Sequence, residues 1–183
     1  MEFYMARIPV IDHETASEEV KKEYEGLVKR HGSATNMKRT LLHSIPALKA
    51  YEEWYPLSDE IEPFIGERGV TLLSFAISAE TDCLLCSTFF RRILIEKGEN
   101  PDKLVLDDTE QLLFDYGRAL GKDPNGVTDE LFARLKSKFS DKQIVQLTAF
   151  AGLMIATNVL NSALRIDLDD YLLNFEKKPG AKK

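Results

Sequence analysis

Residues 70–86 read VTLLSFAISAETDCLLC, and this stretch determines the fold that we expect for the chain. Its first half places Val70, Leu73 and Ile77 three or four residues apart, which is the spacing of the apolar face of a helix. Asp82 is a good N-cap residue, so we expect a second helix to begin at the first cysteine. The stretch therefore predicts two consecutive helices joined by a short turn, with both cysteines in the first turn of the second helix.

The rest of the chain also has the pattern of helices. No alternation of apolar and polar residues persists long enough to build a sheet, whereas helix start and stop signals recur. Seven or eight helices joined by short loops predict an all-α, multi-helical domain. Among the expected helices are those over residues 15–31, 65–79, 83–97, 128–138 and 140–164, and a short one over residues 167–175.

Length and composition indicate one globular domain. The chain has 183 residues, 44% of them hydrophobic and 30% charged, and we assign residues 1–176 to a single domain and residues 177–183 to a disordered tail. The net charge is −6, which disfavours nucleic-acid binding because that function needs a basic face. The first seven residues lack the basic-then-apolar order of a signal peptide, so we expect a cytoplasmic protein.

A long segment without charge, residues 143–164, invites comparison with a membrane span. Its length nearly spans a bilayer, but glutamine, threonine, asparagine and serine recur through it, and a lone span would leave their side chains in lipid. A helix that is buried in the core, or covered by a second copy of the chain, is the better interpretation. We therefore expect a soluble protein without a membrane partner.

The only two cysteines of the chain are three residues apart, at Cys83 and Cys86. On a helix this spacing places both thiols on one face, and the positive end of the helix dipole favours a thiolate, the reactive form of cysteine. We favour a redox-active dithiol. A zinc site is disfavoured because it needs two further ligands, whereas His13, His31 and His43 stand singly. A thioredoxin-like site is disfavoured because it needs strands around it. A pair of cysteines with a purely structural role stays open. We expect neither a metal nor another cofactor.

Glu80 lies three residues before the first cysteine and has two interpretations. A carboxylate at this position could relay a proton to or from a thiol. When ionised it would also raise the pKa of the thiol and so oppose the effect of the helix end. The alternative is a solvated charge without a role, and the residues themselves leave the two interpretations open.

The segment SAETDCLLC, residues 78–86, resembles the core motif of the AhpD-like alkylhydroperoxidase and carboxymuconolactone decarboxylase superfamily. Residues 7–9, residues 36–48 and the asparagine-containing residues 158–164 are similar to other regions of that superfamily, in the same order. The resemblance implies an AhpD-like, all-α fold that associates into homo-oligomers, as dimers, trimers or hexamers. The retained cysteine pair favours the peroxidase-related branch over the lactone decarboxylase branch.

The resemblance also implies an activity and two roles. Cys86 matches the cysteine that attacks a hydroperoxide, and Cys83 matches the one that resolves the sulfenic acid into a disulfide, which a protein or small-molecule dithiol then reduces. The protein is therefore expected to be a peroxidase of the alkylhydroperoxidase type. Its partners would be a small hydroperoxide and the dithiol reductant.

The sequence departs from the superfamily pattern at the proton relay. The positions of the family's glutamate and histidine hold Thr71 and Phe90. Glu67, one helical turn before Thr71, and Glu80 are candidate substitutes. A non-catalytic helical oligomer, or a thiol redox sensor that has lost the relay, is the alternative function.

Overall fold

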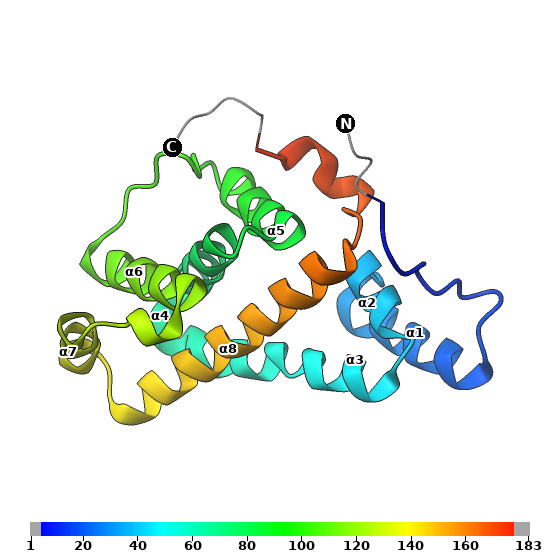
Figure 1. Cartoon of the computed structure of the whole chain (residues 1–183), viewed down its shortest axis with the longest axis horizontal. Coiled ribbons are helices and arrows are strands. Elements are labelled where there is room, and N and C mark those ends of the chain that lie inside the picture. The colour runs from blue at the N-terminus through cyan, green and yellow to red at the C-terminus, as the bar shows by residue number, and fades with distance from the viewer. Residues whose placement is uncertain (1–4, 178–183) are drawn as a thin grey trace.

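Every regular element in residues 5–177, the residues that the computed structural model describes, is helical (Figure 1). This confirms the all-α prediction and the expected number of helices. Residues 1–4 and 178–183, which include most of the expected tail, lie outside the described residues. The elements are α1 (Glu18–His31), α2 (Asn36–Leu41), α3 (Ile45–Glu52), α4 (Trp54–Glu80), α5 (Leu84–Glu96), α6 (Asp108–Lys122), α7 (Asp129–Lys138) and α8 (Asp141–Leu164), with the 3-10 helices η1 (Pro124–Gly126) and η2 (Asp170–Phe175).

Side-chain caps begin most of the helices, as expected from their start signals. Ser140 caps α8 by accepting a hydrogen bond from the Gln143 amide, and Thr128 caps α7 in the same way. Two expectations about the ends of the chain are wrong. The first helix begins after Ser17 rather than at residue 15, and the last helix is a 3-10 helix that starts at Asp170.

The longest element, α4, differs most from the expected pattern. A helix was expected to begin near residue 65, after Pro63, but helical structure extends back to Trp54. The two parts are separated by a kink at Gly66, which has φ 73° and ψ 162°. Glycine adopts a positive φ without steric cost, so the helix bends at Gly66 and then continues.

Helix α4 is the centre of the packing and touches α5, α6 and α8. Its closest approach is to α6, where a Cβ added at Gly117 would lie 2.9 Å from the carbonyl oxygen of Leu73. Figure 1 shows α8 running diagonally across the molecule, from α7 toward the N-terminal helices α1 and α2. The cysteine-bearing α5 is thus packed between the centre of the fold and one end of α8.

Two apolar clusters stabilise the fold. The larger cluster joins α4, α5, α6 and α8. The smaller one joins the N-terminal helices through Leu27, Leu41, Leu42 and Leu48, and Leu160 of α8 packs against it. The candidate site lies where the two clusters meet, because residues from both line the same cavity.

Within the described residues, α8 is the one helix that is long and apolar enough to span a bilayer by length and composition. In the fold it packs instead on α4, α5 and α6 and buries two asparagines, Asn158 and Asn161. Its outer face leaves Val145 and Val159 exposed. The association of copies through this face stays a prediction.

Candidate functional site

The turn between α4 and α5 positions the two cysteines, but it does so differently from the expected way. Asp82 is not the N-cap of α5; it has φ 54°, a left-handed conformation that aspartate tolerates better than most residues. Cys83 is the N-cap itself, and its Sγ accepts a hydrogen bond from the backbone amide of Cys86 at 3.4 Å. The pair therefore spans the start of the helix, with one sulfur at the cap and the other in the first turn.

Both cysteines are free thiols and both are buried. Cys83 is 1% exposed and Cys86 is 3% exposed. Only Cys86 lines the cavity between the helices, so a small molecule that enters the cavity meets this sulfur first. Cys83 lies behind it, which is the arrangement needed for one cysteine to attack a substrate and the other to attack the product.

Two asparagines of α8 hold this turn from the other side. Asn158 donates a hydrogen bond to the Thr81 hydroxyl at 2.8 Å, directly before the turn residue. Asn161 Nδ2 donates to Cys86 Sγ at 3.1 Å. Its Oδ1 is buried and has no hydrogen-bond partner among the described residues. Turned over, this amide would accept a hydrogen bond from a protonated Cys86 thiol, so Asn161 can serve both charge states of the sulfur.

The two thiols titrate as a pair. A hydrogen bond from Cys86 lowers the pKa of Cys83 to about 7, although burial acts in the opposite direction. Burial raises the pKa of Cys86, and the nearby Cys83 raises it further. The pair therefore holds one thiolate near neutral pH, shared through the hydrogen bond between the sulfurs, and transfer of the proton to Cys83 places the charge on Cys86.

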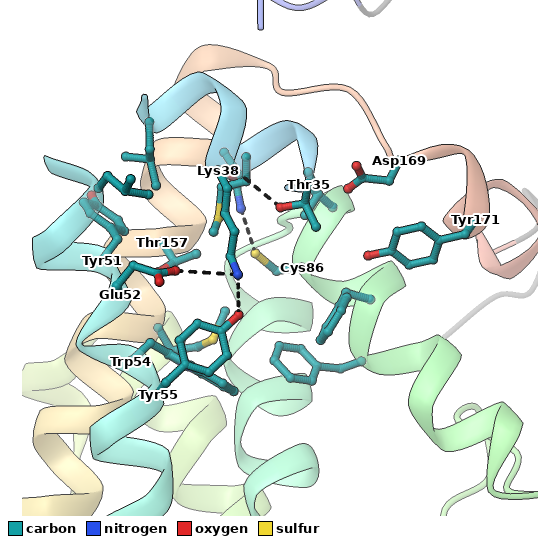
Figure 2. A pocket seen from close by; sticks show the side chains of 18 residues that line it. Thr35, Lys38, Tyr51, Glu52, Trp54, Tyr55, Cys86, Thr157, Asp169 and Tyr171 are labelled. Carbon is teal, nitrogen blue, oxygen red and sulfur yellow. Dashed lines mark hydrogen bonds and ion pairs between the residues drawn. The ribbon is translucent and has the colours of Figure 1, made fainter. Parts of the chain in front are cut away.

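The cavity beside Cys86 has a volume of about 150 Å³ and mostly apolar walls. Residues of α2, α3, α4, α5, α8 and η2 line it (Figure 2). Phe90, at the position of the family's histidine, is one of its walls, so an apolar ring replaces a titratable one there. The aromatic side chains that line it are Tyr51, Trp54, Tyr55, Phe89, Phe90 and Tyr171.

A buried lysine is the main polar group of this cavity, and the sequence did not identify it. Lys38 of α2 is 4% exposed, and its Nζ donates a hydrogen bond to the Tyr55 hydroxyl at 2.8 Å. Its second partner is Glu52, whose Oε1 lies 3.6 Å from Nζ. Figure 2 shows the lysine extending from α2 to these two side chains of α3 and α4, on the opposite side of the cavity from α5.

Glu52 has several basic partners. Its Oε2 lies 2.9 Å from His31 Nε2 and 3.1 Å from Arg30. Burial raises the pKa of Glu52, but the hydrogen bond from His31 and the charge of Lys38 together outweigh burial. The pKa of Glu52 is therefore below its usual value. The His31 ring also stacks on Tyr55, with centroids 4.2 Å apart. His31, the last residue of α1, therefore supports the cavity from behind.

Burial shifts the pKa of both Lys38 and its hydroxyl partner. Removal from water lowers the pKa of Lys38 to about 8, even though Glu52 raises it. The same cause raises the pKa of Tyr55 to about 12, so this hydroxyl keeps its proton. No sequence motif identifies Lys38, Glu52 and Tyr55 as a group, because they come from three separate helices. The one sign of their role is that Lys38 lies in a short helix that is largely buried.

The carboxylates considered as proton relays lie elsewhere. Glu80 pairs with Arg118 at 3.0 Å and is not among the residues that line the cavity. Glu67 pairs with Lys97 at 2.8 Å and is mostly exposed. Thr71 is buried and donates to the Glu67 carbonyl, so it bonds to its own helix. A role of Glu80 as a proton relay stays a prediction.

Residues 5–177 contain no group of three or more histidine, cysteine, aspartate or glutamate side chains placed to hold a metal ion. The alternative of a zinc site built from the cysteine pair and nearby histidines therefore has no support within one copy of the described chain.

Comparison with known proteins identifies the fold. No family model matches the chain, and no curated protein matches its sequence. An uncharacterized peroxidase-related protein from Ralstonia eutropha, described as an alkylhydroperoxidase AhpD core, is similar with a TM-score of 0.71 and 16% identity, over 91% of this chain and 94% of that one. A second peroxidase-related protein, from Silicibacter sp. TM1040, has a TM-score of 0.68 and 16% identity, over 90% of this chain and 93% of that one.

A third similar structure belongs to a protein with a different activity. The debrominase Bmp8 has a TM-score of 0.75 and 14% identity, over 92% of this chain and 95% of that one. A variant of the same debrominase was solved in complex with 2,3,4-tribromopyrrole. These similarities confirm the AhpD-like fold that the sequence predicts, and they show that proteins of this fold have more than one activity.

Proposed function

We propose that the chain is a thiol-dependent oxidoreductase of the AhpD-like superfamily that reduces small hydroperoxides through Cys86 and Cys83. The observation that supports it most is the placement of one sulfur of the pair on the wall of a cavity, with its partner behind it. The pair holds one thiolate near neutral pH, and the peroxidase-related proteins share the fold. A cytoplasmic location belongs to the proposal, because free thiols persist where cellular reductants keep them reduced.

The reaction follows from the order of the two sulfurs. The Cys86 thiolate attacks the terminal oxygen of the hydroperoxide, an S–O bond forms, the O–O bond breaks, and the alkoxide that leaves takes up a proton. Cys83 then attacks the sulfur of the sulfenic acid, a disulfide forms, and the oxygen leaves as water. A dithiol reductant returns two electrons by thiol–disulfide exchange and regenerates the pair.

The experiment that tests this function measures peroxide-dependent oxidation of a dithiol by the wild type and by Cys86→Ser. We expect turnover in the wild type and none above the protein-free rate in the variant. Ser87→Ala, which changes the half-buried neighbour of the cysteine, is the matched control and should be as active as the wild type. Equal rates in wild type and Cys86→Ser would remove this mechanism and leave a thiol sensor or a non-catalytic protein.

A second candidate function is the reductive removal of a halogen from a small aromatic ring. Two observations favour it: aromatic side chains form much of the wall of the cavity, and its volume of about 150 Å³ suits a molecule about as large as benzene. The similarity of the fold to that of a debrominase supports this candidate. Release of bromide from a bromopyrrole or bromophenol in the presence of a dithiol distinguishes this function from peroxide reduction.

A further inference from the structure

The proposed function requires a proton donor inside the cavity, because an alkoxide is a poor leaving group when it departs unprotonated. The histidine position of the family holds Phe90, and the two glutamates considered from the sequence form ion pairs elsewhere. The wall opposite the cysteine helix holds the ammonium group of Lys38. An acid is therefore present in the cavity, but in a place that the family motif does not occupy.

We propose that Lys38 is the catalytic acid of this cavity: its Nζ donates the proton to the oxygen that leaves when the Cys86 sulfur cleaves the O–O bond. The inference rests on the proposed function and adds the residue that completes it. In the step, the S–O bond forms, the O–O bond breaks, and one N–H bond of Lys38 is replaced by an O–H bond of the product alcohol. The neutral amine then regains a proton from water.

The hydrogen bonds of Lys38 leave it free to act on a ligand. An ammonium group has three N–H bonds. One is donated to the Tyr55 hydroxyl at 2.8 Å, and a second is assigned to the ion pair with Glu52, whose oxygen lies 3.6 Å away. The third is available to a molecule in the cavity, whose wall includes the lysine side chain.

A structural role alone explains the lysine poorly. Lysine is among the residues least often fully buried, because its charge is costly to remove from water. Neutralising Glu52 does not require it, because Arg30 and His31 contact that carboxylate at shorter distances than Lys38 does. The lysine is thus buried at a cost, beside a carboxylate that already has partners, with its amine at the cavity.

The charged and titratable groups around Lys38 favour a proton that can be given up and regained. Glu52 provides a negative charge next to the amine, and Tyr55 keeps its proton to about pH 12. Farther around the cavity, Asp169 accepts a hydrogen bond from the Asn36 amide, Tyr171 has a pKa raised by burial, and Cys86 is the sulfur that reacts. Burial lowers the pKa of Lys38 to about 8, close to the pH at which a general acid works best.

The test compares two oxidants whose leaving groups differ in their need for a proton. tert-Butyl hydroperoxide releases an alkoxide, whereas peracetic acid releases acetate, which is stable as an anion. The rate of oxidation of the reduced protein is measured in single-turnover mixing at pH 7 for wild type, Lys38→Met, Lys38→Arg and Lys49→Met. Lys49 is an exposed lysine of α3 and is the control.

We expect Lys38→Met to react with tert-butyl hydroperoxide roughly 100-fold more slowly than wild type, the effect of losing a positioned acid. With peracetic acid the loss should be less than about threefold, and Lys49→Met should match the wild type with both oxidants. Lys38→Arg keeps the charge but holds its proton too firmly to donate it, so it should resemble Lys38→Met. In the wild type the rate with the alkyl hydroperoxide should fall above about pH 8, and in Lys38→Met this fall should be absent.

Equal slowing with both oxidants would overturn the proposal, because a merely structural lysine affects every reaction of the cavity alike. Unchanged rates in Lys38→Met would overturn it as well. If Lys38→Met does not fold, Tyr55→Phe is used instead, because it removes the hydroxyl partner of Lys38 and keeps the ring. In this variant the pH above which the rate with tert-butyl hydroperoxide falls should differ from the wild-type value of about 8. An unchanged pH dependence would count against the proposal. A wild type that reacts with neither oxidant contradicts the peroxidase function itself, which is a separate outcome.

Discussion

The two walls of the cavity are built in opposite ways. The cysteine wall comes from one short stretch of chain, the turn that leads from α4 into α5, which Asn158 and Asn161 of α8 hold in place. The lysine wall is assembled from α2, α3 and α4, with support from the end of α1. The comparison shows that the reactive atom of this protein is specified locally, whereas the charges that surround the substrate depend on how four helices pack.

The two walls also differ in what stabilises them. Hydrogen bonds to the shared thiolate of the two cysteines hold the cysteine wall, and the start of α5 provides a favourable helix dipole. The lysine wall contains a buried ion pair, which stabilises little as a whole but costs a great deal when one partner is removed. Substitutions on the two walls should therefore affect different quantities: thiol reactivity on the first, and stability and proton transfer on the second.

The largest effect on stability is expected from Glu52→Gln. The amide leaves the Lys38 ammonium without its carboxylate partner in an apolar cavity, and breaking a buried pair in this way costs about 3–5 kcal/mol. Urea unfolding at pH 7 measures the change. Glu23→Gln, which removes the partner of the exposed Lys49, is the control and should cost less than about 1 kcal/mol. A loss below about 1 kcal/mol for Glu52→Gln would mean that Lys38 does not depend on this pair.

On the cysteine wall, Cys83→Ser should lower the reactivity of the remaining sulfur strongly. The wild-type pair has a thiolate with a pKa of about 7, whereas burial raises the pKa of Cys86 well above its ordinary value. We expect alkylation of Cys86 by iodoacetamide at pH 7.5 to slow at least about tenfold, because a thiol whose pKa is raised by burial keeps its proton at that pH and only the thiolate reacts. Mass spectrometry of each cysteine follows the reaction.

The converse variant sharpens that result. In Cys86→Ser the new hydroxyl can still donate to Cys83, so the titration of thiolate absorbance should keep its midpoint near 7. A midpoint above 8 in this variant, or unchanged alkylation in Cys83→Ser, would show that the two sulfurs do not share a proton.

The lysine wall should also make stability depend on pH. The pKa of Lys38 is about 8 in the folded protein and 10.5 when unfolded, so between these values only the unfolded chain holds the proton. Raising the pH through this window therefore favours the folded state. Relative to Lys38→Met, the wild type should gain about 2 kcal/mol in free energy of unfolding between pH 7.5 and 9.5. If the difference in free energy of unfolding between the two proteins does not change with pH, the lysine is in contact with water.

The smallest expected effect separates the two asparagines of α8. Asn161→Ala removes the donor to Cys86 Sγ and should slow alkylation about tenfold, because a hydrogen bond to a charged group contributes about 1.5–3 kcal/mol. Asn158→Ala removes the partner of Thr81 and should lower the stability by about 1 kcal/mol without changing that rate. Equal effects of both variants on the rate would mean that the asparagines act only through the geometry of the turn.

The sequence predicted the fold class well because capping residues and apolar spacing are local. Thr128 and Ser140 begin their helices as expected. The prediction failed where geometry depends on neighbours. Asp82 has the side chain of an N-cap but takes the left-handed turn position, and Cys83 caps the helix instead. A new helix is expected to begin near residue 65, whereas α4 already begins at Trp54, continues through the kink at Gly66 and packs on three other helices.

By itself, the sequence determined an all-helical protein with two thiols at the start of a helix, because helix signals and the spacing of the cysteines act over a few residues. Only the tertiary structure decided which sulfur faces a cavity and which charges face that sulfur. The packing of three helices brings together Lys38, Glu52 and Tyr55, and no local sequence pattern specifies the distances between them. Burial then changes their chemistry, because the pKa of a charged group depends on the water that the fold removes around it.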